Sequence, residues 1–296
     1  MISARNLTKK FDGFTALDSI SFDFPDAGIF GVIGHNGAGK TTLLKMIVGL
    51  ITPTSGELIV NGIDVAKDPV ALKENLGYLP EESRLYETMT AENYLAFFGE
   101  IYGLTAPEIQ KRTRDLFDAL SLETDGKKLG EFSKGMKRKT AIARSLIHDP
   151  KFLVYDEPTS GLDPMTSRFI AGYLKRLKDE GRTIVLSAHN LYQVEAICDR
   201  VMILRRGKVV AFGSMHELRE QFGSITYSVF FSAPDPAALE GRVPQIRGED
   251  GLFACDVPDL VGVNDVSAAI TQAGGHIERI ESRYPSLEEM LVAIGK

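Results

Sequence analysis

Short, continuous apolar runs alternate along the chain with stretches that have the period of amphipathic helices. The runs Ile29–Ile33, Phe152–Tyr155 and Thr183–Ser187 are uninterrupted, as in strands that are buried on both faces of a parallel sheet. A helical pattern follows each run, and one of these helices is expected to begin with Asp163 as its N-cap and Pro164 in its first position. The alternation of strands and helices predicts an α/β core.

Other strand-like segments predict an antiparallel layer beside this core. They are Ile2–Leu7, Ile20–Phe24, Gly56–Val60 and Val201–Phe212, the last with a hairpin turn at Arg206 and Gly207. Between residues 82 and 150 the pattern is mostly helical, with helices expected at Ala91–Tyr102, Pro107–Leu120 and Met136–His148. This block predicts a helical subdomain inserted into the α/β core.

The pattern changes again after about residue 220. Strands are expected at Ile225–Phe231, on both sides of a hinge at 248–251, and at His276–Ser282; helices are expected at Pro236–Leu239, at Val266–Gln272 and from Ser286 onward. Ser286 and Glu289 have the spacing of a capping box. We therefore predict two domains: residues 1–220 with the helical subdomain at about 82–150, and a small α+β domain at 221–296.

Composition narrows the possible functions. The chain has 296 residues, and its formal net charge of −6 disfavours nonspecific nucleic-acid binding, which needs a basic surface. The two cysteines, Cys198 and Cys255, lack metal-ligand spacing. The sequence has neither a signal-peptide pattern nor an apolar stretch long enough to span a bilayer. We therefore expect a cytoplasmic protein that reaches any membrane through a partner.

A complete phosphate-binding loop follows the first apolar run. Its residues are Gly34, His35, Asn36, Gly37, Ala38, Gly39, Lys40 and Thr41, which fit the pattern G-x-x-x-x-G-K-[ST]. Glycines let main-chain N–H groups approach a triphosphate, and the N-terminus of the following helix adds partial positive charge. Lys40 supplies a full charge, and Thr41 offers a hydroxyl to Mg²⁺. The loop predicts that this chain binds a nucleoside triphosphate.

Three further features point to hydrolysis of the nucleotide. Asp156 and Glu157 end an apolar strand, where Asp156 is placed to hold Mg²⁺ opposite Thr41 and Glu157 to act as general base on a water. His189 follows the next apolar strand and is a candidate contact to the γ-phosphate.

The third feature is the start of the helix expected near residue 136. Ser133 is a good N-cap beside Gly135, and Lys134, Lys137, Arg138 and Lys139 crowd the same end. The helix dipole disfavours cations there, so a bound polyphosphate is one explanation of the cluster and a solvated basic face is the other.

In this order, these residues resemble the nucleotide-binding subunit of ATP-binding cassette (ABC) transporters over residues 1 to about 220. The resemblance implies a P-loop NTPase core with an antiparallel β layer and an inserted helical subdomain. It also implies that Phe11 stacks on adenine, that Thr42 contacts the α-phosphate, and that Ser133 and Gly135 bind the γ-phosphate of ATP held by the other subunit. Asp163 matches a loop that crosses the dimer interface, and His189 matches the switch histidine.

The mechanism of that family is a head-to-tail dimer that closes on two ATP molecules and moves attached membrane subunits. The resemblance therefore implies Mg²⁺ as cofactor, a homodimer or pseudo-symmetric heterodimer, transmembrane partner subunits, and a position on the inner face of the cell membrane. Tyr86, Met89, Phe97 and Phe98 are candidates for the groove that receives a cytoplasmic helix of the partner. The alternative is that these side chains, Phe97 and Phe98 above all, pack inside the helical subdomain.

Departures from the commonest pattern of the family point to one branch. Glu81 stands where the family usually has glutamine, and its carboxylate is a candidate Mg²⁺ ligand or competing base. Lys134 and Met136 replace the first glycine and the glutamine of the signature. With the C-terminal appendix, these changes look like the drug- and lipid-exporting branch, the ABC-2 type.

Two other interpretations remain open at this point. One is a soluble ABC-type ATPase that acts on ribosomes or nucleic acid, although the single cassette and the acidic balance count against it. The other is a nucleotide-binding regulator without hydrolysis, against which the intact set of Lys40, Asp156, Glu157 and His189 argues.

Overall fold

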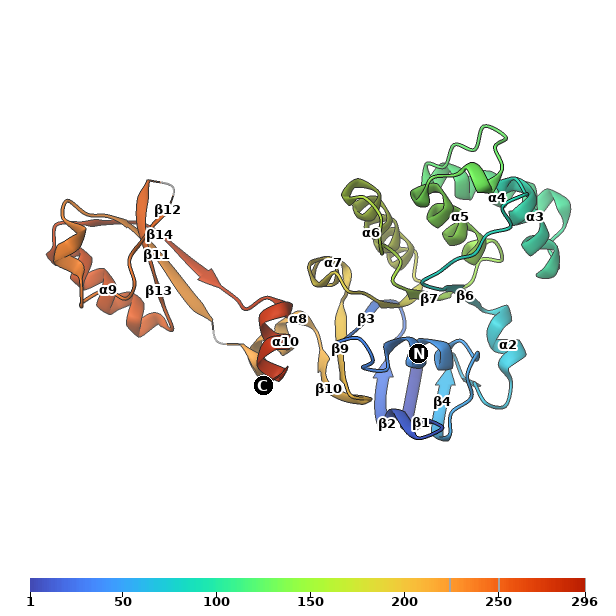
Figure 1. Ribbon diagram of the computed structural model, residues 1–296, viewed down its shortest axis with the longest axis horizontal. Coiled ribbons are helices and arrows are strands. Elements are labelled where there is room, and N and C mark those ends of the chain that lie inside the picture. Colours follow the sequence, from blue (N-terminus) through green and yellow to red (C-terminus); the bar gives the residue numbers. More distant parts are fainter. Residues whose placement is uncertain (224, 250, 296) are drawn as a thin grey trace. The chain divides into compact units, whose positions relative to one another are not determined.

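The computed structural model describes residues 1–223, 225–249 and 251–295 (Figure 1). The chain divides into two compact units, residues 1–215 and residues 216 onward. The dividing point lies at the start of α8 (Met215–Phe222), close to the boundary expected after residue 220.

The first unit contains a six-stranded sheet in the order β10-β9-β3-β8-β7-β6. Its strands are β3 (Ile29–Ile33), β6 (Leu76–Leu79), β7 (Phe152–Asp156), β8 (Thr183–Ser187), β9 (Arg200–Arg205) and β10 (Lys208–Gly213). All neighbours are parallel except β9 and β10, which form an antiparallel hairpin. The residues of β3, β7 and β8 are buried throughout, which confirms the three strands predicted from their continuous apolar runs.

A four-stranded antiparallel sheet lies beside it in the order β2-β1-β4-β5. Its strands are β1 (Ile2–Phe11), β2 (Phe14–Phe24), β4 (Ser55–Val60) and β5 (Ile63–Asp64). The hairpin at Arg206 and Gly207 is confirmed, but its placement in this layer was wrong, because β9 pairs in parallel with β3 of the six-stranded sheet. The reason is burial: Val201–Leu204 is buried throughout, as a central strand requires.

Helix α1 (Lys40–Ile47) packs between the two sheets. Its apolar residues Leu43, Leu44 and Met46 join one hydrophobic core with residues of both sheets, such as Phe24 and Phe30, whose rings stack at 4.7 Å. This packing fixes the start of α1 against the end of β3, where the phosphate-binding loop lies.

The helical subdomain is built from α3 (Ala91–Ile101), α4 (Ala106–Leu120) and α5 (Lys134–Leu146), with a 3₁₀ turn at Leu129–Glu131 (Figure 1). The three helices predicted in this region are confirmed. They pack on one another, and α5 also contacts β6 of the six-stranded sheet. Helices α2 (Pro69–Glu74), α6 (Pro164–Asp179) and α7 (Leu191–Ile197) complete the unit.

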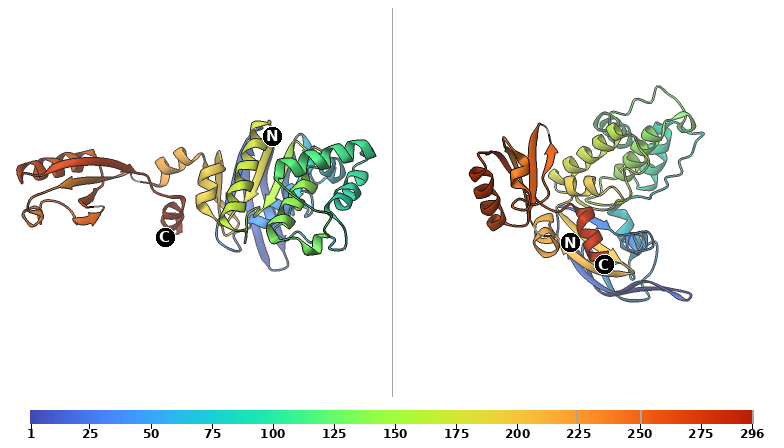
Figure 2. Two further views of the ribbon diagram at one scale, coloured as in Figure 1. Left: turned by 90° about the horizontal axis from the view of Figure 1, so that it is seen from above. Right: turned by 60° about the vertical axis from the view of Figure 1, so that its left-hand side comes forward.

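The second unit is a four-stranded antiparallel sheet in the order β12-β13-β11-β14, with α9 packed on one face (Figure 2). Its elements are β11 (Thr226–Ser232), a 3₁₀ turn (Pro236–Leu239), β12 (Arg247–Glu249), β13 (Leu252–Val257), α9 (Leu260–Gln272), β14 (His276–Arg283) and α10 (Leu287–Gly295). The capping box of Ser286 and Glu289 is present. The hinge expected at 248–251 includes residue 250, which lies outside the described residues. Among the described residues, no helix is long and apolar enough to cross a membrane.

Candidate nucleotide-binding site

The phosphate-binding loop follows β3 and requires glycine at two positions. Gly34 has a φ of +151°, and a Cβ there would lie 2.2 Å from the carbonyl oxygen of Leu204. Gly39 has a φ of +108°, and its Cβ would lie 2.6 Å from the carbonyl oxygen of Ala16. A residue with a Cβ at either position would therefore push the loop away from these main-chain carbonyls. Directly after Gly39, α1 begins at Lys40, so its free N–H groups face the loop.

The side chain of Lys40 bends back over the loop. Its Nζ donates to the carbonyl oxygens of Gly34 at 2.7 Å and His35 at 3.3 Å, and only 7% of the residue is exposed. Burial lowers the pKa of Lys40, and the carboxylates of Glu157 and Asp156 oppose this shift. The ammonium is thus held where the loop would receive a phosphate.

A cavity of about 410 Å³ opens over the loop. It is lined by Phe14, Ala16, Asn36, Gly37, Ala38, Gly39, Lys40, Thr41, Thr42, Glu81, Glu157 and His189. The structure therefore brings together five segments of the sequence: the start of β2, the loop, the end of β6, the end of β7 and the end of β8. Gly34 and His35 shape the loop without lining the cavity.

The two carboxylates at the end of β7 are held by Ser187 of β8. The Ser187 hydroxyl donates to Asp156 Oδ1 at 2.5 Å and accepts from the main-chain N–H of Glu157 at 3.0 Å. Asp156 is 2% exposed and Glu157 is 7% exposed. Sequence reasoning missed Ser187, although a hydroxyl at the end of a buried apolar strand is the signal that marks it.

Glu157 and His189 are in direct contact. The distance from His189 Nε2 to Glu157 Oε1 is 2.6 Å. Burial raises the pKa of the Glu157 carboxyl, His189 opposes this, and the charge of Glu81 raises the pKa further. A carboxylate with a raised pKa at the edge of a phosphate site is well suited to accept a proton from water.

The segment Ser133–Gly135, which we call the signature loop, lies at the start of α5. Ser133 is the N-cap of this helix and its Oγ accepts from Met136 N at 3.2 Å. A Cβ on Gly135 would lie 3.3 Å from the Thr166 side chain, so α5 and α6 approach closely here. The signature loop does not line the cavity over the phosphate-binding loop.

The four cations near the signature loop have different partners within this chain. Lys137 pairs with Glu87 at 3.2 Å, and Lys139 donates to the carbonyl oxygen of Ser121 at 3.0 Å. Arg138 is buried and turned into the core. Lys134 lies against the loop at Gly161.

Three other predicted site residues do not line the cavity: Asp156, which is 2% exposed, Asp163 and Phe11. Asp163 caps α6 and accepts from Thr166 N at 2.9 Å, which lowers the pKa of its carboxyl. Phe11 is 45% exposed, and the Lys9 ammonium lies 5.0 Å from its ring centroid. The aromatic residue that lines the cavity is Phe14, its partner across the β1–β2 hairpin, which sequence reasoning missed.

Comparison with known proteins identifies two parts of the chain. Residues 17–160 match the family model described as ABC transporter. Residues 213–292 match the model described as ATP-binding protein DrrA1-3-like, C-terminal domain.

Similar proteins and structures agree with these matches. The chain is 38% identical over 226 residues to the ABC transporter ATP-binding protein NatA of Bacillus subtilis, covering 74% of this chain and 92% of the relative. It is 37% identical over 268 residues to the linearmycin resistance ATP-binding protein LnrL of the same organism, covering 90% of this chain and 82% of the relative. A solved ATP-binding subunit of an ABC transporter is 33% identical, with a TM-score of 0.69 over 75% of this chain and 93% of that one.

The loop geometry, the paired carboxylates and these matches agree on nucleotide hydrolysis within one family. The chain belongs to the ABC transporter family, as an ATP-binding subunit with the P-loop NTPase fold that hydrolyses ATP.

Proposed function

We propose that this chain powers an exporter by closing with a second copy, or with a related subunit, around two ATP molecules in a head-to-tail dimer. The observation that carries the proposal is the split site. The cavity over the phosphate-binding loop contains Lys40, Glu157 and His189, but no residue of the signature loop lines it. The start of α5 still presents free N–H groups, and Ser133 there is exposed. In this proposal, the phosphate bound by the loop of one copy is contacted by the signature loop of the other copy.

In this proposal, each residue of the cavity has one task. Lys40 and the N–H groups of the loop bind the β- and γ-phosphates, and Thr42 binds the α-phosphate. Glu157 accepts the proton of the attacking water, and His189, which now contacts Glu157, contacts the γ-phosphate. Asp163 lies in the loop between the copies.

The residues present fit Mg²⁺ bound together with ATP. The described residues contain no cluster of three or more His, Cys, Asp or Glu side chains able to hold a metal alone. Mg²⁺ typically takes one or two protein oxygens and completes its shell with phosphates and water. Thr41, Asp156 and Glu81 offer such oxygens, and the ion would neutralise charge on the phosphates.

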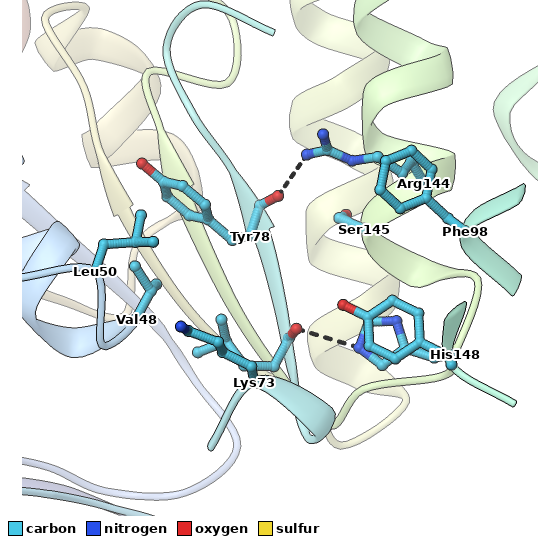
Figure 3. A pocket seen from close by; sticks show the side chains of 10 residues that line it. Val48, Leu50, Lys73, Tyr78, Phe98, Arg144, Ser145 and His148 are labelled. Carbon is cyan, nitrogen blue, oxygen red and sulfur yellow. Dashed lines mark hydrogen bonds between the residues drawn. The ribbon is translucent and has the colours of Figure 1, made fainter. Parts of the chain in front are cut away.

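We propose that a cytoplasmic helix of a membrane subunit docks in a groove between the helical subdomain and the core. The groove has a volume of about 220 Å³, and its lining includes Phe98 of α3 and Tyr102, the residue that follows this helix. Val48 and Leu50 lie across the groove from Phe98 (Figure 3). Phe98 packs edge-on against Phe97, whose ring is 39% exposed. An open apolar groove of this kind suits an amphipathic helix.

Two more aromatic or apolar candidates, Tyr86 and Met89, extend this surface. Tyr86 is 51% exposed and its ring packs edge-on against Phe97 at 5.9 Å, while Met89 is half-buried. Two cations, Lys73 and Arg144, line the groove beside its apolar side chains. The proposed occupant therefore carries both apolar and acidic side chains.

Export is the direction that the relatives favour. The name of one relative refers to linearmycin resistance, and the C-terminal match belongs to the DrrA1-3-like type. No specific observation favours the alternative of a soluble ATPase on ribosomes or nucleic acid.

Co-purification from native membranes tests this function. Tagged Glu157→Gln protein with ATP and Mg²⁺ is expected to bring down a multi-span membrane protein in stoichiometric amount. Phe98→Asp in the same background is expected to lose it, whereas Ile101→Asp, an exposed position on the same helix, is expected to retain it. Ribosomal or repair proteins without a membrane partner would overturn the proposal.

A further inference from the structure

Arg138 is a buried cation at the centre of the catalytic unit. It lies on α5 and only 7% of it is exposed. Its guanidinium donates to five main-chain carbonyl oxygens, those of Pro80, Glu81, Asp156, Glu157 and Pro158. Nε donates to Pro158 at 2.8 Å, and Nη1 donates to Pro80 at 2.9 Å. The planar fork of arginine, with five N–H donors, is the side chain that suits such a contact.

These carbonyls belong to two separate catalytic segments. Pro80 and Glu81 follow β6, whereas Asp156 and Glu157 end β7 and continue into the next turn. Arg138 itself comes from the helix that begins at the signature loop. One side chain therefore joins three segments of the site without lining the nucleotide cavity.

The main chain at Glu157 needs this support. Glu157 has a φ of +49°, in the left-handed region that residues with a Cβ seldom adopt. Such a conformation persists only where the surroundings hold it. The N–H of Glu157 is bound by Ser187 Oγ at 3.0 Å, and its carbonyl oxygen accepts from Arg138. The peptide groups on both sides of Glu157 are thus fixed, and with them the direction of its side chain.

Arg138 also balances charge in the core. Burial lowers the pKa of its guanidinium to about 10, and the carboxylates of Asp156, Glu81 and Glu157 oppose the shift. The group therefore stays charged at neutral pH. Together with Lys40, it places two cations near the three carboxylates.

We propose that Arg138 is a positioning residue for hydrolysis, which holds Glu157 in its left-handed conformation and ties it to Glu81 and to α5. The proposal rests on the proposed role of Glu157 as general base. Because α5 begins at the signature loop, a shift of this helix moves the main chain at Glu157 with it.

Steady-state ATPase kinetics on the full chain test the proposal. Arg138→Gln is expected to lower kcat roughly 10- to 100-fold, the usual cost of misplacing a catalytic group by about 1 Å, while the KM for ATP changes less than about 3-fold. Arg138→Lys keeps the charge but not the fork, so its kcat should lie between those of Arg138→Gln and the unchanged protein. The matched control is Arg112→Gln, which removes a guanidinium bond of 3.1 Å to the carbonyl oxygen of Ile147 outside the site and should leave kcat unchanged.

Turnover is expressed per nucleotide-binding site, so that a loss of folded protein is not counted as a loss of catalysis. An Arg138→Gln protein whose kcat per site equals that of Arg112→Gln would overturn the proposal. So would a loss of ATP binding in parallel with kcat.

A double-mutant cycle keeps the proposal testable if Arg138→Gln does not fold. Because Arg138 acts through Glu157, Arg138→Lys should lower kcat when Glu157 is present. The same substitution in the Glu157→Gln protein should cause no further loss of kcat. Equal losses in both backgrounds would contradict the proposal. Absence of ATP turnover in the unchanged protein would instead refute the proposed function itself.

Discussion

At the scale of single residues, the site depends on main-chain positions that few side chains tolerate. Gly34 and Gly39 let the loop approach neighbouring carbonyls that a Cβ would strike. Glu157 adopts a left-handed conformation that Ser187 and Arg138 hold from both sides. The main-chain conformation thus fixes the loop and the direction of the Glu157 side chain.

The sequence predicted which residues come together at the cavity where their positions depend on local spacing. Lys40 and Thr41 lie in one contiguous motif, and Glu157 and His189 follow apolar strands whose ends meet at one edge of a parallel sheet. Arg138 could not be placed in this way. Its neighbours on the helix are cations too, and only tertiary packing decides which of them turns into the core.

The adenine base is the subject of a prediction at this scale. Because Phe14 lines the cavity and Phe11 does not, Phe14→Ala should weaken ATP binding about 10-fold, as expected for the loss of one stacking contact. Phe11→Ala, which removes a ring of similar exposure from the same hairpin, should weaken it less. Titration with a fluorescent ATP analogue measures both affinities. A larger loss in Phe11→Ala would restore Phe11 as the adenine platform.

At the scale of elements, α5 connects the helical subdomain to the six-stranded sheet. It contacts α3, α4 and β6, and Arg144 donates to the carbonyl oxygen of Tyr78 at 2.9 Å. The long helices and the fully buried strands were predicted because their periodicity extends over enough residues. The short elements β6 and α2 were not, since four to six residues give no clear period and β6 contains Gly77.

The contact between α5 and β6 has a pH dependence that can be measured. His148, just after α5, stacks on Tyr102 at 3.7 Å, and its Nε2 lies 3.2 Å from the carbonyl oxygen of Leu76 (Figure 3). Burial lowers its pKa to about 4, whereas an unfolded histidine titrates near 6.5. The unfolded chain therefore binds more protons between these values, and stability falls as the pH drops from about 6.5 to about 4.

Urea denaturation at a series of pH values checks this prediction. His148 should account for roughly 2 kcal/mol of the lost unfolding free energy, after allowance for its partial exposure. His148→Phe keeps the ring stack but cannot be protonated, so its stability should vary less over this pH range. The exposed His276 is the control, since His276→Gln should leave the pH profile unchanged. Identical profiles for His148→Phe and the unchanged protein would refute the assignment.

At the scale of the whole molecule, the phosphate-binding loop and the signature loop lie apart within one copy, and we propose that they are the two halves of a nucleotide site completed by a second copy. The cavity over the phosphate-binding loop is lined by Glu157, the proposed general base, while the signature loop presents a helix start outside it. The two-domain organisation with a boundary after residue 220 stays a prediction, as does the homodimer or heterodimer. The sequence could suggest this arrangement only through its resemblance to a family, because assembly depends on surfaces rather than on local periodicity.

The most direct test of the split site is the mass of the Glu157→Gln protein with ATP and Mg²⁺, measured by light scattering. This variant keeps the phosphate-binding loop but removes the proposed proton acceptor, so ATP should persist and hold two copies together. We predict a mass twice the 32.5 kDa of a single chain with ATP, and a single-chain mass without it or when Lys40→Ala is added. A Glu157→Gln protein that binds ATP fully and remains a single chain at high concentration would contradict the account.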